Sequence, residues 1–220
     1  LMYGLPHQSA ETIRRTVALT ADLAPTRIAL FGYAHVPWFK KHQRLIDEAA
    51  LPGASERLAL EAEARRALAE AGYEAIGLDH FARADDAMAV AARAGTLRRN
   101  FQGYTTDTAD TLIGFGASSI GQTAFGFVQN DPDIGRWRRA IEKGNLPIAK
   151  GKAVDDDDRL RAAIIERIMC DYAVDLDEVC AAHGVTTDAV ADAFERLEEP
   201  ARDGLVAIDG HRLTVSEAGK

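Results

Sequence analysis

The sequence predicts an α/β fold in which part of a (β/α) barrel is followed by a small helical domain of winged-helix type. Strand and helix patterns alternate over the first 95 residues with short links, which is typical of βαβ units. The region 96–130 loses the helical period and is rich in glycine. After an acidic run at 155–158, three short helical patterns and two strands complete the chain. We therefore expect two domains, residues 1–150 and residues 151–220.

In the first domain, apolar periodicity and turn residues set the expected elements. Ser9 is a suitable helix cap, Pro6 stops the first strand, and Gly72 and Gly95 are usual helix stops. The strand at 26–33 is almost continuously apolar, as in a parallel sheet that is covered on its outer face. The elements expected are strands at 1–5, 26–33 and 73–78, and helices at 10–23, 54–71, 84–94 and 133–143.

In the second domain, the acidic run is interpreted as a boundary that precedes the helices. A turn at Gly210 separates the two final strands. We expect helices at 160–170, 176–183 and 187–197, and strands at 205–208 and 212–215. Three helices followed by two strands form a winged-helix pattern.

Charge disfavours nucleic acid as a partner. The formal net charge of the chain is −8. Residues 151–220 carry eight basic and 17 acidic side chains, and the helix that would enter a DNA groove is itself acidic. Phosphate contacts need Lys or Arg, so this module is expected to pack or cover rather than to bind DNA.

No stretch predicts a membrane span, and the chain opens without the basic and apolar segments of a signal peptide. The longest charge-free run, 111–130, is interrupted by four glycines. The only cysteines, Cys170 and Cys180, lie among apolar neighbours, which predicts buried thiols and a cytoplasmic location.

Four segments in which polar or small residues cluster are candidates for ligand binding, two of them at predicted strand ends. In the segment 31–37, Gly32 and Ala34 are small enough for a ligand to approach the backbone. In the segment 77–83, Arg83 is suited to a carboxylate and His80 to proton transfer. The segment 97–106 combines basic, amide and aromatic groups, and the segment 112–121 is rich in Gly and Ser, which predicts binding through backbone groups.

Each of these segments also has a purely structural explanation. Gly32 then only relieves crowding, His35 is a loop histidine with its own partner, and Arg83 pairs locally with Asp79 or Asp85. No metal-ligand motif, phosphate-binding loop or nucleophile elbow is present in the sequence. We therefore predict no catalytic residue and no metal ligand within these 220 residues.

In this order and spacing, the segments resemble the oxygen-independent coproporphyrinogen III oxidases, which are radical S-adenosylmethionine enzymes of haem synthesis. The Asn-Phe-Gln-Gly-Tyr-Thr-Thr string at 100–106 is specific, because the related haem chaperones differ there. The matching strings are Tyr3-Gly4-Leu5-Pro6 with Gln8, Tyr33-Ala34-His35-x-Pro37, Asp79-His80-Phe81-Ala82-Arg83, Arg99-Asn100-Phe101-Gln102-Gly103-Tyr104-Thr105-Thr106 and Gly114-x-Gly116.

The resemblance implies an oxidoreductase with a partial radical-SAM barrel, two bound S-adenosylmethionine molecules and a [4Fe–4S] cluster held by three cysteines near the amino end. It implies that a 5′-deoxyadenosyl radical removes hydrogen from the β-carbon of two propionates of coproporphyrinogen III. These propionates then become vinyls, carbon dioxide leaves, and protoporphyrinogen IX forms. Ala34 and Ile120 match positions that contact the second S-adenosylmethionine. Cys170 and Cys180 do not match the cluster ligands.

The substrate carries four carboxylates, so its propionates need cations. From charge and position we expect Arg83 and Arg99 to bind them, with His80 and Asn100 beside them. Because Leu1-Met2-Tyr3 reads as a buried strand with no lead-in, we expect a fragment. We expect it to be inactive alone, because the cysteines that the resemblance assigns to the cluster are absent from it. Two alternatives stay open, a related haem chaperone and a non-catalytic winged-helix interaction protein. The sequence identifies neither the electron donor nor the acceptor.

Overall fold

The computed structural model describes residues 1–220 and divides into two compact units, Leu1–Leu97 and Arg98–Lys220. The boundary predicted near residue 150 stays a prediction. Residues 150 and 151 both lie inside one strand, β10. None of the helices combines the length and the apolar character needed to cross a lipid bilayer.

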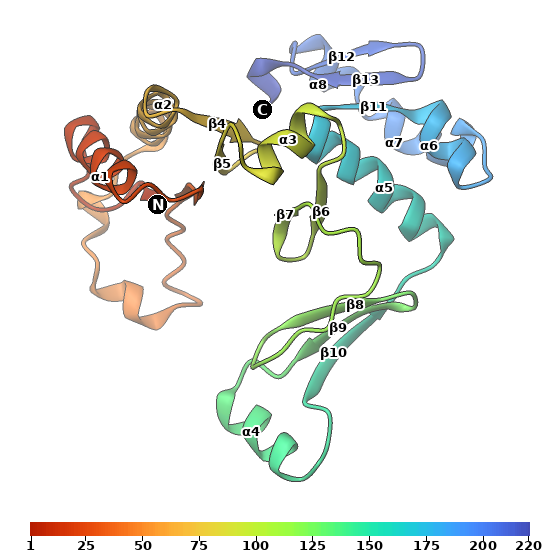
Figure 1. The fold of residues 1–220 in the computed structure, drawn as a ribbon, viewed down its shortest axis with the longest axis horizontal. Helices are drawn as coiled ribbons and strands as arrows, with labels where there is room; N and C mark the ends of the chain where they lie inside the picture. The colour runs from red at the N-terminus through yellow and green to blue at the C-terminus, as the bar shows by residue number, and fades with distance from the viewer. The chain divides into compact units, whose positions relative to one another are not determined.

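The first unit alternates strands and helices (Figure 1). Its elements are β1 (Met2–Tyr3), α1 (Ala10–Asp22), β2 (Arg27–Ala29), β3 (Phe31–Gly32), α2 (Ala54–Glu70), β4 (Tyr73–Ile76), β5 (His80–Arg83) and α3 (Ala87–Arg93), with 3-10 helices at Lys41–Leu45 and Glu48–Ala50.

Local capping explains where its helices begin. The Ser9 hydroxyl accepts a hydrogen bond from the Thr12 amide at 3.2 Å, and the Thr12 hydroxyl accepts one from the Ser9 amide at 2.8 Å. At the start of α3, the Asp86 carboxylate accepts from the Met88 amide at 2.7 Å. These side chains satisfy amides that the first helical turn leaves unpaired.

The strand pairing differs in part from the parallel order predicted for this unit. β1 and β3 are parallel, but β5 lies between β2 and β4 and runs antiparallel to both. The chain reverses at Gly77, where φ is +57°, a value that glycine adopts at little cost. His80 and Arg83 therefore lie on a strand and not in a loop after one. The predicted strand at 26–33 is also divided at Leu30 into β2 and β3.

The core of this unit lies between the two long helices and the strands. α1 and α2 pack on one another and bury a common set of apolar side chains. The buried residues are Ile13, Val17, Ile28, Leu30, Leu60, Ala64, Leu68, Tyr73 and Phe81.

The second unit contains the remaining elements (Figure 1). They are β6 (Arg98–Asn100), β7 (Gly103–Thr105), β8 (Ile120–Thr123), β9 (Gly126–Asn130), α4 (Ile134–Glu142), β10 (Ile148–Ala153), α5 (Asp156–Asp171), β11 (Ala173–Asp175), α6 (Leu176–Ala182), α7 (Ala191–Glu195), α8 (Glu198–Arg202), β12 (Val206–Asp209) and β13 (Arg212–Val215), with 3-10 helices at Thr187–Val190 and Glu217–Gly219.

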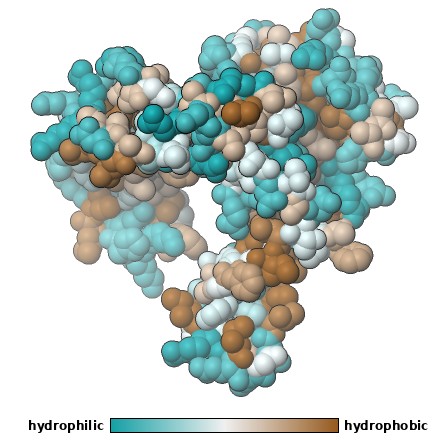
Figure 2. Space-filling model, viewed as in Figure 1, coloured by the Kyte–Doolittle hydropathy of each residue, from teal (hydrophilic) through white to brown (hydrophobic).

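β8, β9 and β10 form an antiparallel sheet, and α4 lies in the connection between β9 and β10. β10 was not predicted, because its sequence Ile-Ala-Lys-Gly-Lys-Ala carries little apolar character and its side chains are exposed. Figure 2 shows apolar surface on this lobe. Several of its large apolar side chains are exposed, including Phe115 at 90% and Leu146 at 80%.

The terminal residues have winged-helix topology, as predicted. The order is helix α5, strand β11, helix α6, the helical segment 187–195, the short helix α8, and then β12 and β13, with β13 in the centre of the sheet. Leu160, Val174, Leu176, Cys180, Val190 and Leu213 form its core. The acidic run, which the sequence analysis interprets as a boundary, forms the cap and first turn of α5. Asp155 accepts from the Asp158 amide at 2.8 Å, and acidic side chains there favour the positive end of the helix dipole.

Replacing Leu68 with Ala is expected to lower the free energy of unfolding by about 2–5 kcal/mol, because Leu68 is fully buried between the helices and the substitution leaves a cavity. Leu58, which is 67% exposed on the same helix, is the matched control, and Leu58→Ala should change stability by less than about 0.5 kcal/mol. Urea unfolding followed by circular dichroism measures both. Equal losses would contradict this placement of the core.

Candidate functional site

The β6–β7 hairpin carries most of the Asn-Phe-Gln-Gly-Tyr-Thr-Thr string and is anchored to helix α5. The Glu166 carboxylate accepts from the Arg98 guanidinium at 3.0 Å and from the Arg99 amide at 2.9 Å. The Tyr104 hydroxyl, in a buried residue, donates to the Met169 carbonyl at 3.0 Å. The hairpin is thus fixed to α5 along both strands.

The tip of this hairpin is a two-residue turn, Phe101-Gln102. The Asn100 side-chain oxygen accepts from the Gln102 amide at 2.8 Å, so this oxygen stabilises the turn. The Phe101 ring is 58% exposed and lies 5.3 Å from the Phe127 ring, centroid to centroid. The turn therefore presents an aromatic ring and an amide side chain at a defined place.

A cavity of about 520 Å³ lies between this turn and the glycine-rich loop. It brings two of the sequence-predicted segments together, because one wall comes from the turn and the other from the loop that leads into β8. Its lining residues are Phe101, Gln102, Leu112, Ile113, Gly114, Phe115, Ala117, Ser118, Ser119 and Ile120.

The carbonyl groups of the glycine-rich loop are bound by protein side chains. The side-chain amide of Asn130 donates to the Gly114 carbonyl at 3.1 Å and to the Gly116 carbonyl at 2.9 Å. The Ser119 hydroxyl also donates to the Gly116 carbonyl, at 2.9 Å. A Cβ at Gly114 would lie 2.8 Å from the Ser119 Cβ and 2.9 Å from the Ile120 carbonyl oxygen. The loop is therefore tightly built, and only part of its backbone is available to a ligand.

Ile120 directs its own peptide groups away from β9. The backbone N–H of Asn130 donates to the Ser119 carbonyl at 2.9 Å, so Ser119 and Asn130 are a hydrogen-bonded pair of the antiparallel ladder. The next pair, Ile120 and Gln129, is therefore a non-hydrogen-bonded pair. The N–H and C=O of Ile120 hence face the edge where Leu112 pairs with Gln122. That pairing is a single bridge and does not reach Ile120, which leaves both groups at the cavity edge.

In the first unit, Gly32 makes room for a protein side chain. A Cβ there would lie 3.0 Å from a terminal nitrogen of Arg57 and 3.1 Å from the Tyr3 hydroxyl. Gly4, with φ of +80°, is packed against the same guanidinium, and Gln8 accepts from the Gly4 amide at 2.7 Å. The structural explanation of Gly32, relief of crowding, thus has named neighbours, and its role as a point of ligand approach stays a prediction.

Ala34 is exposed in the loop that follows β3. Its carbonyl accepts from the side chain of Gln43 at 3.0 Å, whereas its amide has no acceptor within the protein. The next residue, His35, bridges the Tyr33 hydroxyl at 3.2 Å and the Glu48 carboxylate at 3.1 Å. Of the two backbone groups of Ala34, the amide is therefore the one left for a ligand.

The basic residues expected to bind propionates lie on strands β5 and β6. Arg83 is half exposed, and its nearest carboxylate, Asp85, is 4.0 Å away. The Arg99 guanidinium lies 5.6 Å from the Tyr104 ring centroid. His80 contacts the Asp79 carboxylate at 2.7 Å, which fixes the orientation of its ring. Arg83 and His80 belong to the first unit, and Arg99 and Asn100 to the second.

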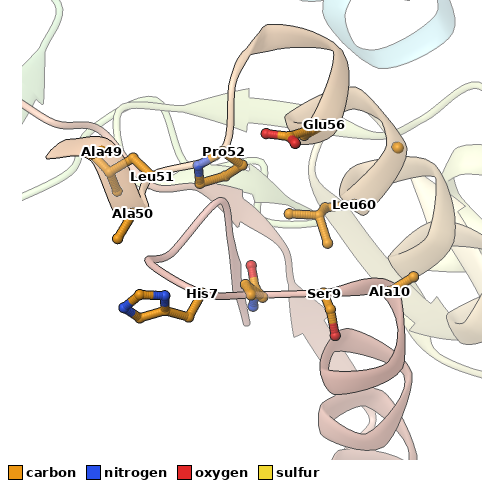
Figure 3. Close-up of a pocket in the computed structure, with 11 residues that line it drawn as sticks. His7, Ser9, Ala10, Ala49, Ala50, Leu51, Pro52, Glu56 and Leu60 are labelled. Carbon is orange, nitrogen blue, oxygen red and sulfur yellow. The ribbon is translucent and has the colours of Figure 1, made fainter. Parts of the chain in front are cut away.

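A second cavity, of about 460 Å³, lies near the start of α1 (Figure 3). His7, Ser9 and Ala10 line one side, Ala49–Pro52 lie opposite, and Glu56 and Leu60 come from α2. Glu56 accepts from the Gly53 amide at 2.8 Å and so belongs to a helix cap. Gln8, which belongs to the first of the matching strings, lines this cavity, and none of the predicted binding residues does.

Both cysteines are buried, and no group of three or more His, Cys, Asp or Glu side chains is placed to hold a metal ion. Burial raises the pKa of the Cys170 thiol to about 11. Burial likewise raises the pKa of Cys180. A thiol that resists ionisation is a poor metal ligand and a poor nucleophile.

Three residues of these sites were not singled out from the sequence, namely Gln43, Arg57 and Glu166. Each is a polar residue within a helical segment and forms hydrogen bonds with residues outside that segment. The one available signal was the Tyr-Gly and Phe-Gly pairs at 3–4 and 31–32, whose glycines predict a close neighbour without identifying it.

Native Cys170 is expected to react with a disulfide reagent at pH 8 at least about 100-fold more slowly than in the urea-unfolded chain. A pKa raised from 9.0 to about 11 lowers the thiolate fraction by that factor, and burial slows access further. Absorbance of the released thiol, with Cys180→Ala to isolate Cys170, gives the rates. Equal rates in the two states would contradict this environment.

Gly114→Ala is expected to destabilise the glycine-rich loop by about 1–3 kcal/mol, because the added methyl has no space beside Ser119. The matched control is Gly151→Ala in β10, where the nearest atom would be 3.6 Å away. Amide hydrogen exchange in segment 112–122 measures the effect. Unchanged exchange in the Gly114 variant would show that the loop has room to adapt.

Comparison with known proteins identifies relatives along the whole chain. Residues 154–220 match the HemN C-terminal domain family. The chain is 52% identical over 216 residues to an oxygen-independent coproporphyrinogen III oxidase of Bradyrhizobium diazoefficiens, covering 98% of this chain and 48% of that protein. It is 36% identical over 221 residues to the Pseudomonas aeruginosa protein of the same name, covering 100% of this chain and 48% of that protein.

A solved structure is similar along almost the whole chain. It is coproporphyrinogen III oxidase (HemN) from Escherichia coli, described as a radical SAM enzyme. The TM-score is 0.92 at 34% identity, over 99% of this chain and 51% of that one. The chain thus spans about half the length of the relatives it matches. It belongs to the family of oxygen-independent coproporphyrinogen III oxidases.

Proposed function

We propose that this chain supplies one part of the active site of an oxygen-independent coproporphyrinogen III oxidase. The observation that carries the proposal is the cavity beside the Phe101-Gln102 turn, which joins two segments that the family resemblance singles out. The sequence identity of 36–52% to proteins of that name supports it.

We further propose that S-adenosylmethionine contacts Ala34 and Ile120 through backbone groups. The Ala34 amide and the N–H and C=O of Ile120 lack protein partners. They are therefore able to bind a polar ligand without breaking an existing hydrogen bond. An adenine edge, with adjacent donors and acceptors, is chemically suited to such groups.

The described cysteines do not fit an iron–sulfur cluster. Cys170 and Cys180 are buried in the packing of α5 and α6, and no third ligand lies beside them. We expect the cluster ligands of the enzyme to lie outside residues 1–220. When bound at such a cluster, S-adenosylmethionine supplies the radical that takes hydrogen from a propionate β-carbon.

Within this chain, the proposed task is to bind and orient the substrate. The four carboxylates of coproporphyrinogen III require cations. Arg83 is half exposed and its ion pair with Asp85 is long, at 4.0 Å, and the Arg99 guanidinium lies beside the Tyr104 ring. Loss of hydrogen from the β-carbon and of carbon dioxide from the carboxyl leaves one electron per propionate, which passes to an external acceptor. His80, fixed by Asp79, and the amide of Asn100 are expected to lie beside the carboxylates.

In the enzyme of full family length, Arg83→Ala and Arg99→Ala are each expected to raise the KM for coproporphyrinogen III about tenfold or more. A charge-assisted hydrogen bond to a carboxylate contributes about 1.5–3 kcal/mol, which corresponds to that factor. Turnover is measured anaerobically by the formation of protoporphyrinogen IX.

Arg138→Ala is the matched control, because Arg138 is 71% exposed on α4 and lines neither cavity. If both active-site variants kept the KM of the wild type, their role in substrate binding would be excluded. If the wild-type enzyme bound haem and released no carbon dioxide, the proposed activity itself would be wrong.

A further inference from the structure

The loop Tyr33–Val36 is held from two sides by side chains that reach it from outside the strand. On one side, the Arg57 guanidinium of α2 donates to the Tyr33 carbonyl at 2.8 Å. On the other side, Gln43 donates to the Ala34 carbonyl at 3.0 Å and accepts from the Val36 amide at 2.6 Å. Three of the peptide groups around Ala34 are thus bound by side chains.

Gln43 is the buried polar residue of this structure, with 8% of its surface exposed. Both ends of its amide are hydrogen-bonded, which compensates for its burial. A side chain that crosses from one 3-10 helix to bind both Ala34 and Val36 fixes the distance between these two peptide groups. The loop consequently has little freedom to turn about Ala34.

Arg57 fixes the direction of the Ala34 amide. The Tyr33 carbonyl and the Ala34 N–H belong to one peptide group, which is trans, so they point in opposite directions. Because the carbonyl points at the guanidinium, the N–H points away from it. Gly4 and Gly32 leave the space through which this side chain passes, since a Cβ at Gly32 would lie 3.0 Å from it.

We propose that Arg57 and Gln43 are positioning residues that hold the Ala34 amide in the direction needed for ligand binding. This inference rests on the proposed function, in which that amide contacts S-adenosylmethionine. Neither side chain touches the ligand in this arrangement. They act by ordering the loop before binding, so that binding does not have to pay the entropic cost of ordering it.

The test begins with the loop itself, in the 220-residue chain without ligand. Arg57→Met and Gln43→Met keep the length of each side chain and remove its hydrogen bonds. Amide hydrogen exchange of the peptide that contains Tyr33 and Val36 should become at least about tenfold faster in both variants, as expected when local hydrogen bonds are lost. Exchange in β4 and α1 should stay unchanged, which distinguishes a local effect from unfolding.

Arg66→Met is the matched control, because Arg66 lies on the same helix and pairs only with Glu63 and Glu70 on its exposed side. It should leave exchange of the loop at the wild-type rate. Arg57→Lys retains a cationic donor and should restore part of the protection. If neither Arg57→Met nor Gln43→Met accelerated exchange of the loop, the inference would be overturned.

The second measurement uses the enzyme of full family length and S-adenosylmethionine as the probe. Arg57→Met should raise the KM for S-adenosylmethionine about tenfold and change kcat much less, with partial recovery in Arg57→Lys. Faster exchange together with an unchanged KM would overturn the positioning role. If the wild-type enzyme did not use S-adenosylmethionine at all, the proposed function would fail, while the exchange result would still decide whether the two side chains order the loop.

Discussion

Buried backbone N–H and C=O groups need hydrogen-bond partners, and near the candidate site side chains supply several of them in both units. Side chains bind the carbonyls, namely Gln43 at Ala34, Arg57 at Tyr33, and Asn130 at Gly114 and Gly116. Among the groups that keep no protein partner are the amide of Ala34 and the N–H and C=O of Ile120. The protein thereby selects which backbone atoms are available for binding.

Much of the fold followed from local sequence signals. Helices α1, α2 and α4 begin and end within a few residues of the predicted positions, because Ser9, Gly72 and Asp133 act on the adjacent backbone. The strand pairing did not follow from local signals. β5 pairs antiparallel with β2 and β4 because the chain reverses direction at Gly77, and the sequence pattern did not predict that reversal. β10 was not predicted because all of its residues are exposed, and its sequence lacks the alternation of apolar and polar residues that indicates a strand.

The candidate site was predictable as a set of segments but not as a geometry. The strings around Ala34, His80, Asn100 and Ile120 were recognised from their residue types and spacing. The residues that hold them were not, because Glu166 is separated by 67 residues from the amide it binds, and Arg57 by 24 from its carbonyl. Sequence patterns report neighbours within one element, whereas these contacts join different elements.

Helix α5 has two attachments. Leu160 on its first half belongs to the core of the winged-helix module, and Glu166 and Met169 on its second half hold the β6–β7 hairpin. A helix of 16 residues is stiff, so a rotation of the module that carries α5 with it would turn the β6–β7 hairpin, and with it Phe101, by a comparable angle. Exchanging this module between family members would therefore require the hairpin to be exchanged with it.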